Sequence, residues 1–140
     1  MMGFKVRDLF KLKKWQPDLS REPPLKSDWP DHIITLNNNK FDEFVDKFPV
    51  AVIDFWAPWC QPCKALGPRL RQLSKTYKGK VAFGKVNIDN YNELAKRFHV
   101  LSIPNLIFFS YGEKVTNLLG VKPIKDIQVK IDEILKRFES

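Results

Sequence analysis

An almost continuously apolar run, VAVIDFW at residues 50–56, leads directly into the only two cysteines of the 140-residue chain, within the segment Trp59-Cys60-Gln61-Pro62-Cys63. A run so rich in β-branched and aromatic residues is typical of a strand that is buried on both faces, as in parallel sheets covered by helices. Apolar side chains then recur at helical spacing at Leu66, Leu70, Leu73 and Tyr77. The cysteine pair is therefore predicted at the junction of a buried strand and a helix in an α/β protein.

The flanking patterns extend this junction into an alternation of strands and helices. Strands are predicted at 32–36, 50–56, 81–88, 105–109 and 114–119. Helices are predicted at about 39–48, 60–77, 91–98 and from Pro123 onward. Asn38 or Asn39 is expected to cap the first helix, and Pro68 to kink the second. The order β-α-β-α-β-α-β-β-α predicts a central mixed sheet of about five strands with helices on both faces.

Residues 1–31 differ in composition from the rest of the chain. Residues 17–30 contain four prolines and few apolar side chains, so we expect an extended linker with few core contacts. One domain is then expected over 32–140. Residues 1–16 carry five Lys and Arg side chains among apolar ones. This basic segment is compatible with a membrane-surface helix, a docking helix for a partner, a tail packed on the domain or a solvated tail.

Charge and composition argue against several classes of protein. Residues 1–16 carry five basic side chains and one acidic, which is half of the net charge of +8. The other half of the net charge is spread over residues 17–140 without forming a basic cluster, so a nucleic-acid partner is not expected. No run reaches the ~20 apolar residues of a membrane span, and the charged start does not resemble a secretory signal. We expect a soluble, cytoplasmic monomer.

Two cysteines three residues apart fit half of a metal site, a structural disulfide or a redox pair. A zinc site needs two more ligands, and the only histidines, His32 and His99, lie on different predicted elements. The apolar content of 44% fills a core without a disulfide, and structural disulfides are rare in reducing compartments. The pattern therefore favours redox chemistry, and no metal is expected.

The predicted positions give the two thiols different roles. Cys60 begins a helix, where unpaired N–H groups and the helix dipole stabilise a thiolate, so it is expected to be the more acidic and more exposed nucleophile. Cys63, one turn later, can form the disulfide that releases the product. Asp54 is expected to accept the proton of Cys63 through a water, the alternative being a hydrogen-bonded core carboxyl. Lys85 is either a cation beside Asp54 or a solvated strand lysine.

The segment VIDFWAPWCQPCK resembles the active-site segment of the thioredoxin family, and the resemblance covers about residues 32–138. Further matches outside the two cysteines are Asp54, Trp59, Pro62, Lys64, Pro68, Lys85, Ile103, Pro104, Gly112 and Gly120. The departures from the commonest family pattern are Gln61, His99, Ser102 and Asn105. The extension at 1–31 has no counterpart in the minimal family.

This resemblance implies a thioredoxin fold, a cis peptide bond before Pro104 and catalysis by Cys60 and Cys63 with Asp54 and Lys85. It also implies a client-binding surface formed by Trp59, Pro62, Ile103, Pro104 and Gly120. The implied activity is the reduction of disulfides in client proteins, with recharging by a thioredoxin reductase. The implied protein holds no organic cofactor and uses NADPH only through that reductase.

The residues between the cysteines bear on the direction of the reaction. Gln61 and Pro62 stand where oxidising members carry a thiolate-stabilising histidine, and this favours a reductant. A disulfide isomerase or oxidase is the alternative within the fold. A thioredoxin-fold binding module docked through its N-terminal segment is the alternative from another class.

Overall fold

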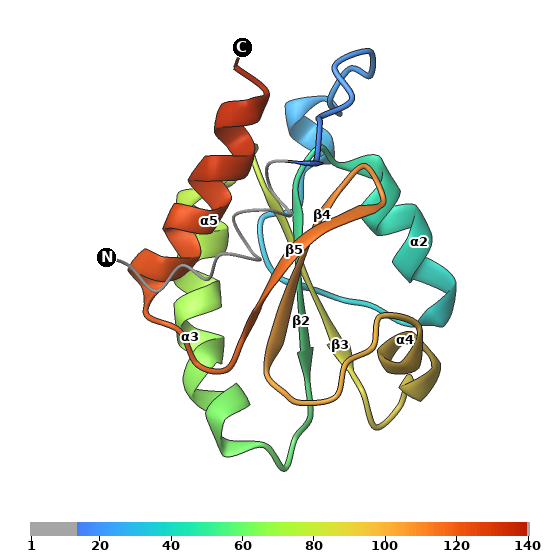
Figure 1. The fold of residues 1–140 in the computed structure, drawn as a ribbon, viewed down its shortest axis with the longest axis vertical. Coiled ribbons are helices and arrows are strands. Elements are labelled where there is room, and N and C mark those ends of the chain that lie inside the picture. Colours follow the sequence, from blue (N-terminus) through green and yellow to red (C-terminus); the bar gives the residue numbers. More distant parts are fainter. Residues whose placement is uncertain (1–13, 140) are drawn as a thin grey trace.

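The computed structural model describes residues 14–139, which form a twisted five-stranded sheet between two layers of helices (Figure 1). The strands are β1 (Ile34–Thr35), β2 (Ala51–Trp56), β3 (Ala82–Asn87), β4 (Asn105–Ser110) and β5 (Glu113–Leu119). Their order across the sheet is β1-β3-β2-β4-β5, in which β1, β3 and β2 are parallel while β4 and β5 are antiparallel to their neighbours. The predicted mixed sheet is confirmed.

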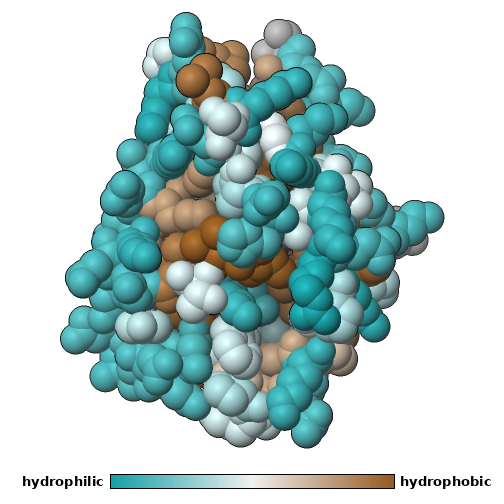
Figure 2. Space-filling view, turned by 180° about the vertical axis from the view of Figure 1, so that it is seen from behind, coloured by the Kyte–Doolittle hydropathy of each residue, from teal (hydrophilic) through white to brown (hydrophobic). Residues whose placement is uncertain are grey.

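Helices cover both faces of this sheet and enclose two separate cores. The helices α2 (Asn38–Lys47) and α4 (Asn92–Arg97) lie on one face, and α3 (Gln61–Thr76) and α5 (Ile124–Arg137) on the other (Figure 1). Each face of β2 supplies fully buried side chains to one core, since successive strand residues point to opposite faces. On the side seen from behind, Figure 2 shows apolar surface in the middle, ringed by hydrophilic side chains.

Two local boundaries differ from the sequence prediction. The side chain of Asn37, not of Asn38 or Asn39, accepts the cap hydrogen bond from the backbone N–H of Lys40, at 2.8 Å. Strand β1 covers two residues instead of the predicted five, because only Ile34 and Thr35 pair with β3. Both differences arise at element ends, and at the cap three asparagines in succession offer the backbone equivalent partners.

The chain before residue 32 contributes to both cores, and Trp29 makes the expectation of few core contacts from the predicted linker at 17–30 wrong. Trp15 is only 5% exposed in the α3/α5 core, and Trp29 is 7% exposed in the α2/α4 core. Arg137 donates a hydrogen bond from Nη1 to the backbone oxygen of Trp15 at 2.8 Å. The ring of Trp29 lies 4.8 Å from that of Phe48. Residues 1–13, with most of the proposed docking segment, lie outside the described residues.

A short 3-10 helix, η1 (Lys26–Asp28), precedes Trp29 in this extension. Farther back, Arg21 binds the end of α2, donating to the carboxylate of Asp46 at 3.3 Å and to its backbone oxygen at 2.9 Å. Its guanidinium also lies 4.1 Å from the centre of the Tyr111 ring at the β4–β5 turn. The extension thus crosses the end of the molecule opposite the N-terminus of α3 (Figure 1).

The close packing of β3 gives a first prediction, for Gly84. A Cβ at this position would lie 2.7 Å from Cδ1 of Leu36 and 3.1 Å from Cδ1 of Ile53, inside van der Waals contact. We expect Gly84→Ala to lower the free energy of unfolding by about 1–3 kcal/mol, measured by urea denaturation, because overpacking forces the core to shift. The matched control is Gly67→Ala in α3, whose Cβ has space. Equal stability of the two variants would contradict this account of Gly84.

Candidate active site

The cysteines lie where β2 passes into α3, as predicted, and form a disulfide with 5.3 Å between their Cα atoms. Cys60 is the N-cap residue of α3, and its sulfur accepts a hydrogen bond from the backbone N–H of Cys63 at 3.2 Å. An unpaired N–H at a helix N-terminus therefore points at the sulfur that was expected to carry the negative charge.

The expected difference in exposure between the two thiols is not seen in this disulfide form. Cys60 is 5% exposed and Cys63 is 4% exposed. The disulfide draws both sulfur atoms into a small apolar cluster with Ala57, against which Trp56 and Ile103 pack. The sequence prediction concerned the free Cys60 thiol of the reduced protein, in which no disulfide to Cys63 fixes the position of the sulfur.

Three of the predicted client-binding residues meet on one side of the disulfide. The bond between Ile103 and Pro104 is cis, and the sulfur of Cys60 lies 3.9 Å from the backbone oxygen of Ile103. Gly120, with φ of +82°, donates its N–H to the oxygen of Pro104 at 2.8 Å, which joins the end of β5 to this loop. The backbone of Ile103 is thus brought beside the reactive sulfur.

On the other side of Cys60, Trp59 presents an exposed ring. Its side chain is 66% exposed, and its Nε1 donates to both carboxylate oxygens of Asp89 at 3.1 and 3.2 Å. Pro62 is also exposed, in the first turn of α3. Leu101 adds an apolar side chain that is 95% exposed, two residues before Ile103. The disulfide is therefore surrounded by exposed apolar groups.

Asp54 lies behind the disulfide and is nearly enclosed. It is 6% exposed, and its Oδ1 has no hydrogen-bond partner among residues 14–139. Burial raises the pKa of its carboxyl to about 7, although the positive charge of Lys85 acts in the opposite direction. Lys85 is the register partner of Asp54 on β3, which brings the two predicted residues side by side.

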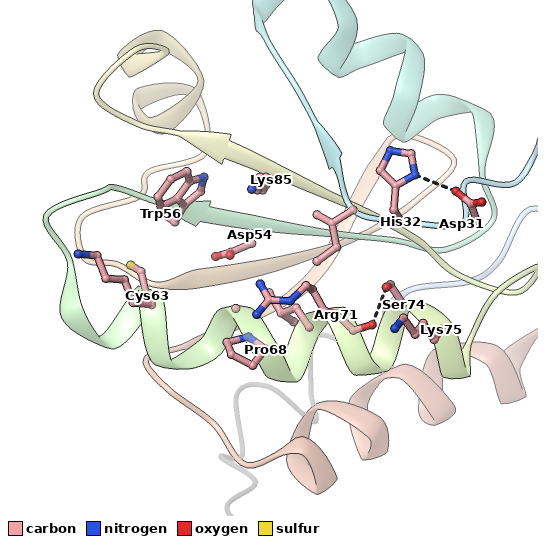
Figure 3. A pocket seen from close by; sticks show the side chains of 14 residues that line it. Asp31, His32, Asp54, Trp56, Cys63, Pro68, Arg71, Ser74, Lys75 and Lys85 are labelled. Atoms are coloured by element: carbon pink, nitrogen blue, oxygen red, sulfur yellow. Dashed lines mark hydrogen bonds and ion pairs between the residues drawn. The ribbon is translucent and has the colours of Figure 1, made fainter.

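A cavity of about 470 Å³ opens beside Asp54 and runs along α3 (Figure 3). Asp54, Trp56 and Cys63 lie at one end of it, and His32 and Lys75 at the other. The side chain of Cys63, not that of Cys60, lines it, so the cavity gives water a route to the resolving sulfur and the buried carboxyl.

His32 lies at the opposite end of the cavity from Cys63. His32 Nδ1 is 2.8 Å from the carboxylate of Asp31, and His99 follows α4 with φ of 55°. Within residues 14–139, no three His, Cys, Asp or Glu side chains form a group suited to a metal ion. Over the same residues, no helix has both the length and the apolar content to cross a membrane.

Comparison with known proteins agrees with this geometry, since the thioredoxin family model matches residues 32–133. The chain belongs to the thioredoxin family. It is 37% identical over 103 residues to a thioredoxin of Staphylococcus haemolyticus, covering 74% of this chain and 98% of that one. It is 38% identical over 101 residues to the chloroplastic M-type thioredoxin of Spinacia oleracea. That match covers 71% of this chain but 56% of the spinach protein.

Solved structures lead to the same family. A mutant thioredoxin from Halobacterium salinarum superimposes with a TM-score of 0.72 at 26% identity, covering 76% of this chain and 94% of that one. The thioredoxin of Malassezia sympodialis gives 0.69 at 31% identity, with 74% and 90% covered. With the disulfide at the start of α3, these similarities make the protein a thiol–disulfide oxidoreductase of this family.

Several residues around the site were not found by sequence reasoning. Asp89 holds the ring of Trp59, and its only sequence signal is its place just after a predicted strand. Trp56 ends the predicted buried strand at 50–56, and the structure shows that it also lines the cavity beside Asp54. Arg71 also lines the cavity, and nothing in the sequence distinguishes it from other surface basic residues on α3.

Proposed function

We propose that this protein reduces disulfides of client proteins through its Cys60-Gln61-Pro62-Cys63 pair and is recharged by a thioredoxin reductase. The observation that carries the proposal is the hydrogen bond from the N–H of Cys63 to the sulfur of Cys60 at the N-terminus of α3. In the reduced protein, the same N–H and the helix dipole stabilise a thiolate on Cys60 and make it the nucleophile.

In the first step, the Cys60 thiolate attacks one sulfur of the client disulfide. The client S–S bond breaks, a mixed disulfide forms, and the other client sulfur leaves as a thiolate that takes a proton from water. An extended client segment would dock against Trp59, Pro62, Ile103, Pro104 and Gly120, pairing with the backbone of Ile103 in a β-type contact. The exposure of Trp59 and the position of Ile103 beside Cys60 support this docking.

In the second step, Cys63 gives its proton to the carboxylate of Asp54, through water in the cavity, and attacks the sulfur of Cys60. The Cys60–Cys63 disulfide forms, and the client leaves with both of its sulfurs reduced. A pKa near 7 suits Asp54 to this exchange at neutral pH, and Lys85 opposite it acts as the modulating cation. Two electrons pass from the dithiol to the client, and the reductase restores them from NADPH.

The wider setting of this activity follows from the same family membership. We infer a monomer that carries electrons in the cytoplasm, contributes to cell redox homeostasis and needs no metal or bound organic cofactor. The domain that performs the chemistry would be residues 32–140, with 1–31 as its extension. Because chloroplastic proteins are among the relatives, cell fractionation followed by immunoblotting tests the cytoplasmic location.

Insulin reduction tests the proposed direction of the reaction. With dithiothreitol as electron source, the protein is expected to accelerate insulin precipitation well above the rate with dithiothreitol alone. A redox titration should place its potential nearer the reducing end, ~−270 mV, than the ~−120 mV of strong oxidants. No acceleration would leave the binding-module alternative, and a potential near the oxidising end would leave the isomerase or oxidase alternative.

The buried carboxyl makes a separate prediction on stability, for Asp54→Asn. The folded-state pKa of about 7 lies above the ordinary value of 3.8, so the folded protein binds the proton more tightly. Stability supplied by the protonated form is therefore lost as pH rises from about 4 to about 7 and stays absent above that. At about 1.4 kcal/mol per pKa unit, the charged form costs about 4 kcal/mol at pH 8.

We expect the Asp54→Asn variant to be more stable than the natural protein at pH 8 and of nearly equal stability at pH 4, measured by urea denaturation at each pH. The amide has no proton to lose, so its stability should not follow this titration. Turnover of insulin should fall by about 100-fold, since the proton acceptor is lost as well. A stability difference that stays constant between pH 4 and 8 would contradict the burial-raised pKa.

A further inference from the structure

The cavity beside α3 combines an excess of positive charge with apolar walls. Its apolar lining includes Ile33, Pro68 and Leu70. Four basic side chains line it against two aspartates, and these four are Lys64, Arg71, Lys75 and Lys85. One of the aspartates, Asp31, is already bound by His32 at 2.8 Å. Even with both aspartates charged, the four basic side chains leave the lining with a net positive charge, which attracts anions.

The side chain of Arg71 lines this cavity while remaining exposed to solvent. A Cβ placed on Gly67 would lie 3.5 Å from Nη1 of Arg71, so the guanidinium covers Gly67 one turn back along the helix. Figure 3 shows it directed toward the end that holds Asp54. Among residues 14–139 it has no hydrogen-bond or ion-pair partner. A guanidinium in this state presents a fork of donors that suits an oxyanion.

The inner end of the cavity holds two buried polar atoms without partners. They are Nε1 of Trp56 and Oδ1 of Asp54, both enclosed and without a hydrogen bond to any of residues 14–139. The indole N–H can only donate, so it requires an acceptor. A buried polar group left unsatisfied destabilises the fold, and an occupant that supplies the missing partner recovers part of that cost.

We propose that this cavity is a binding site for a small organic anion with an apolar body, such as an aryl sulfonate or an aryl carboxylate. The acidic group accepts hydrogen bonds from Arg71 and from Nε1 of Trp56, and the apolar body lies along Ile33 and Leu70. The volume of about 470 Å³ falls within the ~300–1,000 Å³ of small-molecule sites.

Such an anion is coupled to the protonation of Asp54. The charged groups that face this carboxyl are Lys85 on β3, Lys64, Arg71 and Lys75 on α3, and the His32–Asp31 pair before β1. A protonated Asp54 tolerates a neighbouring anion, whereas a charged one repels it, so binding weakens as pH rises through about 7. By reciprocity, the bound anion holds Asp54 protonated. If the proposed reduction cycle holds, Asp54 then cannot accept the proton of Cys63, and the anion inhibits release of the client.

Binding is tested on the full-length oxidised protein with benzenesulfonate, followed by ¹⁵N–¹H NMR, and with uncharged benzenesulfonamide as the matched ligand. We expect saturable shifts confined to cavity residues, with benzenesulfonate bound about tenfold more tightly than the sulfonamide. Arg71→Gln should weaken benzenesulfonate binding by about tenfold. Lys40→Gln, which removes one positive charge from the opposite face of the sheet, should leave it unchanged. Asp54→Asn should bind with an affinity that no longer falls between pH 6 and 8.

Equal affinity for the charged and the neutral ligand would overturn the anion site, as would equal losses in Arg71→Gln and Lys40→Gln. Shifts spread over other basic surfaces, or no saturable shifts, would overturn it too. Because this readout needs no turnover, it separates the inference from the proposed function. Binding by a protein that fails to reduce insulin would support the site and contradict the reductase. Inhibition of insulin reduction by benzenesulfonate, lost in Arg71→Gln, would support the coupling to Asp54.

Discussion

Replacing Cys60 by serine is expected to abolish insulin reduction, with a loss of about a thousandfold or more, because the thiol that the N-terminus of α3 activates as nucleophile is lost. Cys63→Ser should fail at the next step instead. Its Cys60 can still attack the client, but nothing displaces the product, so a covalent complex between protein and client accumulates. Intact-protein mass spectrometry under non-reducing conditions distinguishes the two variants.

The same pair of variants tests which thiol is activated by the helix. Brief alkylation of the reduced natural protein near neutral pH, followed by peptide mapping, should label Cys60 first, because its sulfur receives the N–H of Cys63. Cys63→Ser should then react at nearly the natural rate and Cys60→Ser far more slowly. Preferential labelling of Cys63, or mixed disulfides in Cys60→Ser, would reverse the assignment of the two roles.

Most of the fold follows from patterns that are local in the sequence. The apolar run at 50–56 favours a buried central strand, and the turn residues before β5 favour a hairpin, so both features were predictable from the sequence. Asp54 lies beside Lys85 because of the parallel register of β2 and β3. The apolar pattern of the two segments predicted two buried strands but did not determine this register. The cis bond before Pro104 was implied only by family resemblance, since trans is the default for any X–Pro bond.

The parts that sequence reasoning missed depend on contacts between distant segments. Trp29 lies among prolines and charged residues, a context typical of a solvated linker, yet it fills a site beside Phe48. Arg71 has the pattern of a surface helix residue and is exposed, yet its guanidinium lies over Gly67 and lines the cavity beside Asp54. The local sequence around a residue carries no information about the space that distant segments leave for its side chain. The positions of Trp29 and Arg71 were therefore not predictable.

The buried tryptophans of the extension lead to the second large expected effect. Removing a buried Trp side chain typically costs about 3–5 kcal/mol. Domains are stable by only about 5–15 kcal/mol, so deleting residues 1–31, and with them both Trp15 and Trp29, should remove much of the stability of the protein. We expect a deletion of 1–31 to unfold at a far lower urea concentration than the natural protein.

Single substitutions separate the contribution of each ring from that of the chain. Trp15→Ala and Trp29→Ala should each lower the free energy of unfolding by about 3 kcal/mol, whereas Trp59→Ala, the matched change at a residue that is 66% exposed, should have a much smaller effect. Per folded molecule, the 32–140 fragment should still reduce insulin, because the extension crosses the end of the molecule opposite Cys60 (Figure 1). Unchanged stability of Trp15→Ala and Trp29→Ala would show that these rings contribute nothing to holding the fold. A folded fragment without activity would place the extension in the catalytic cycle itself.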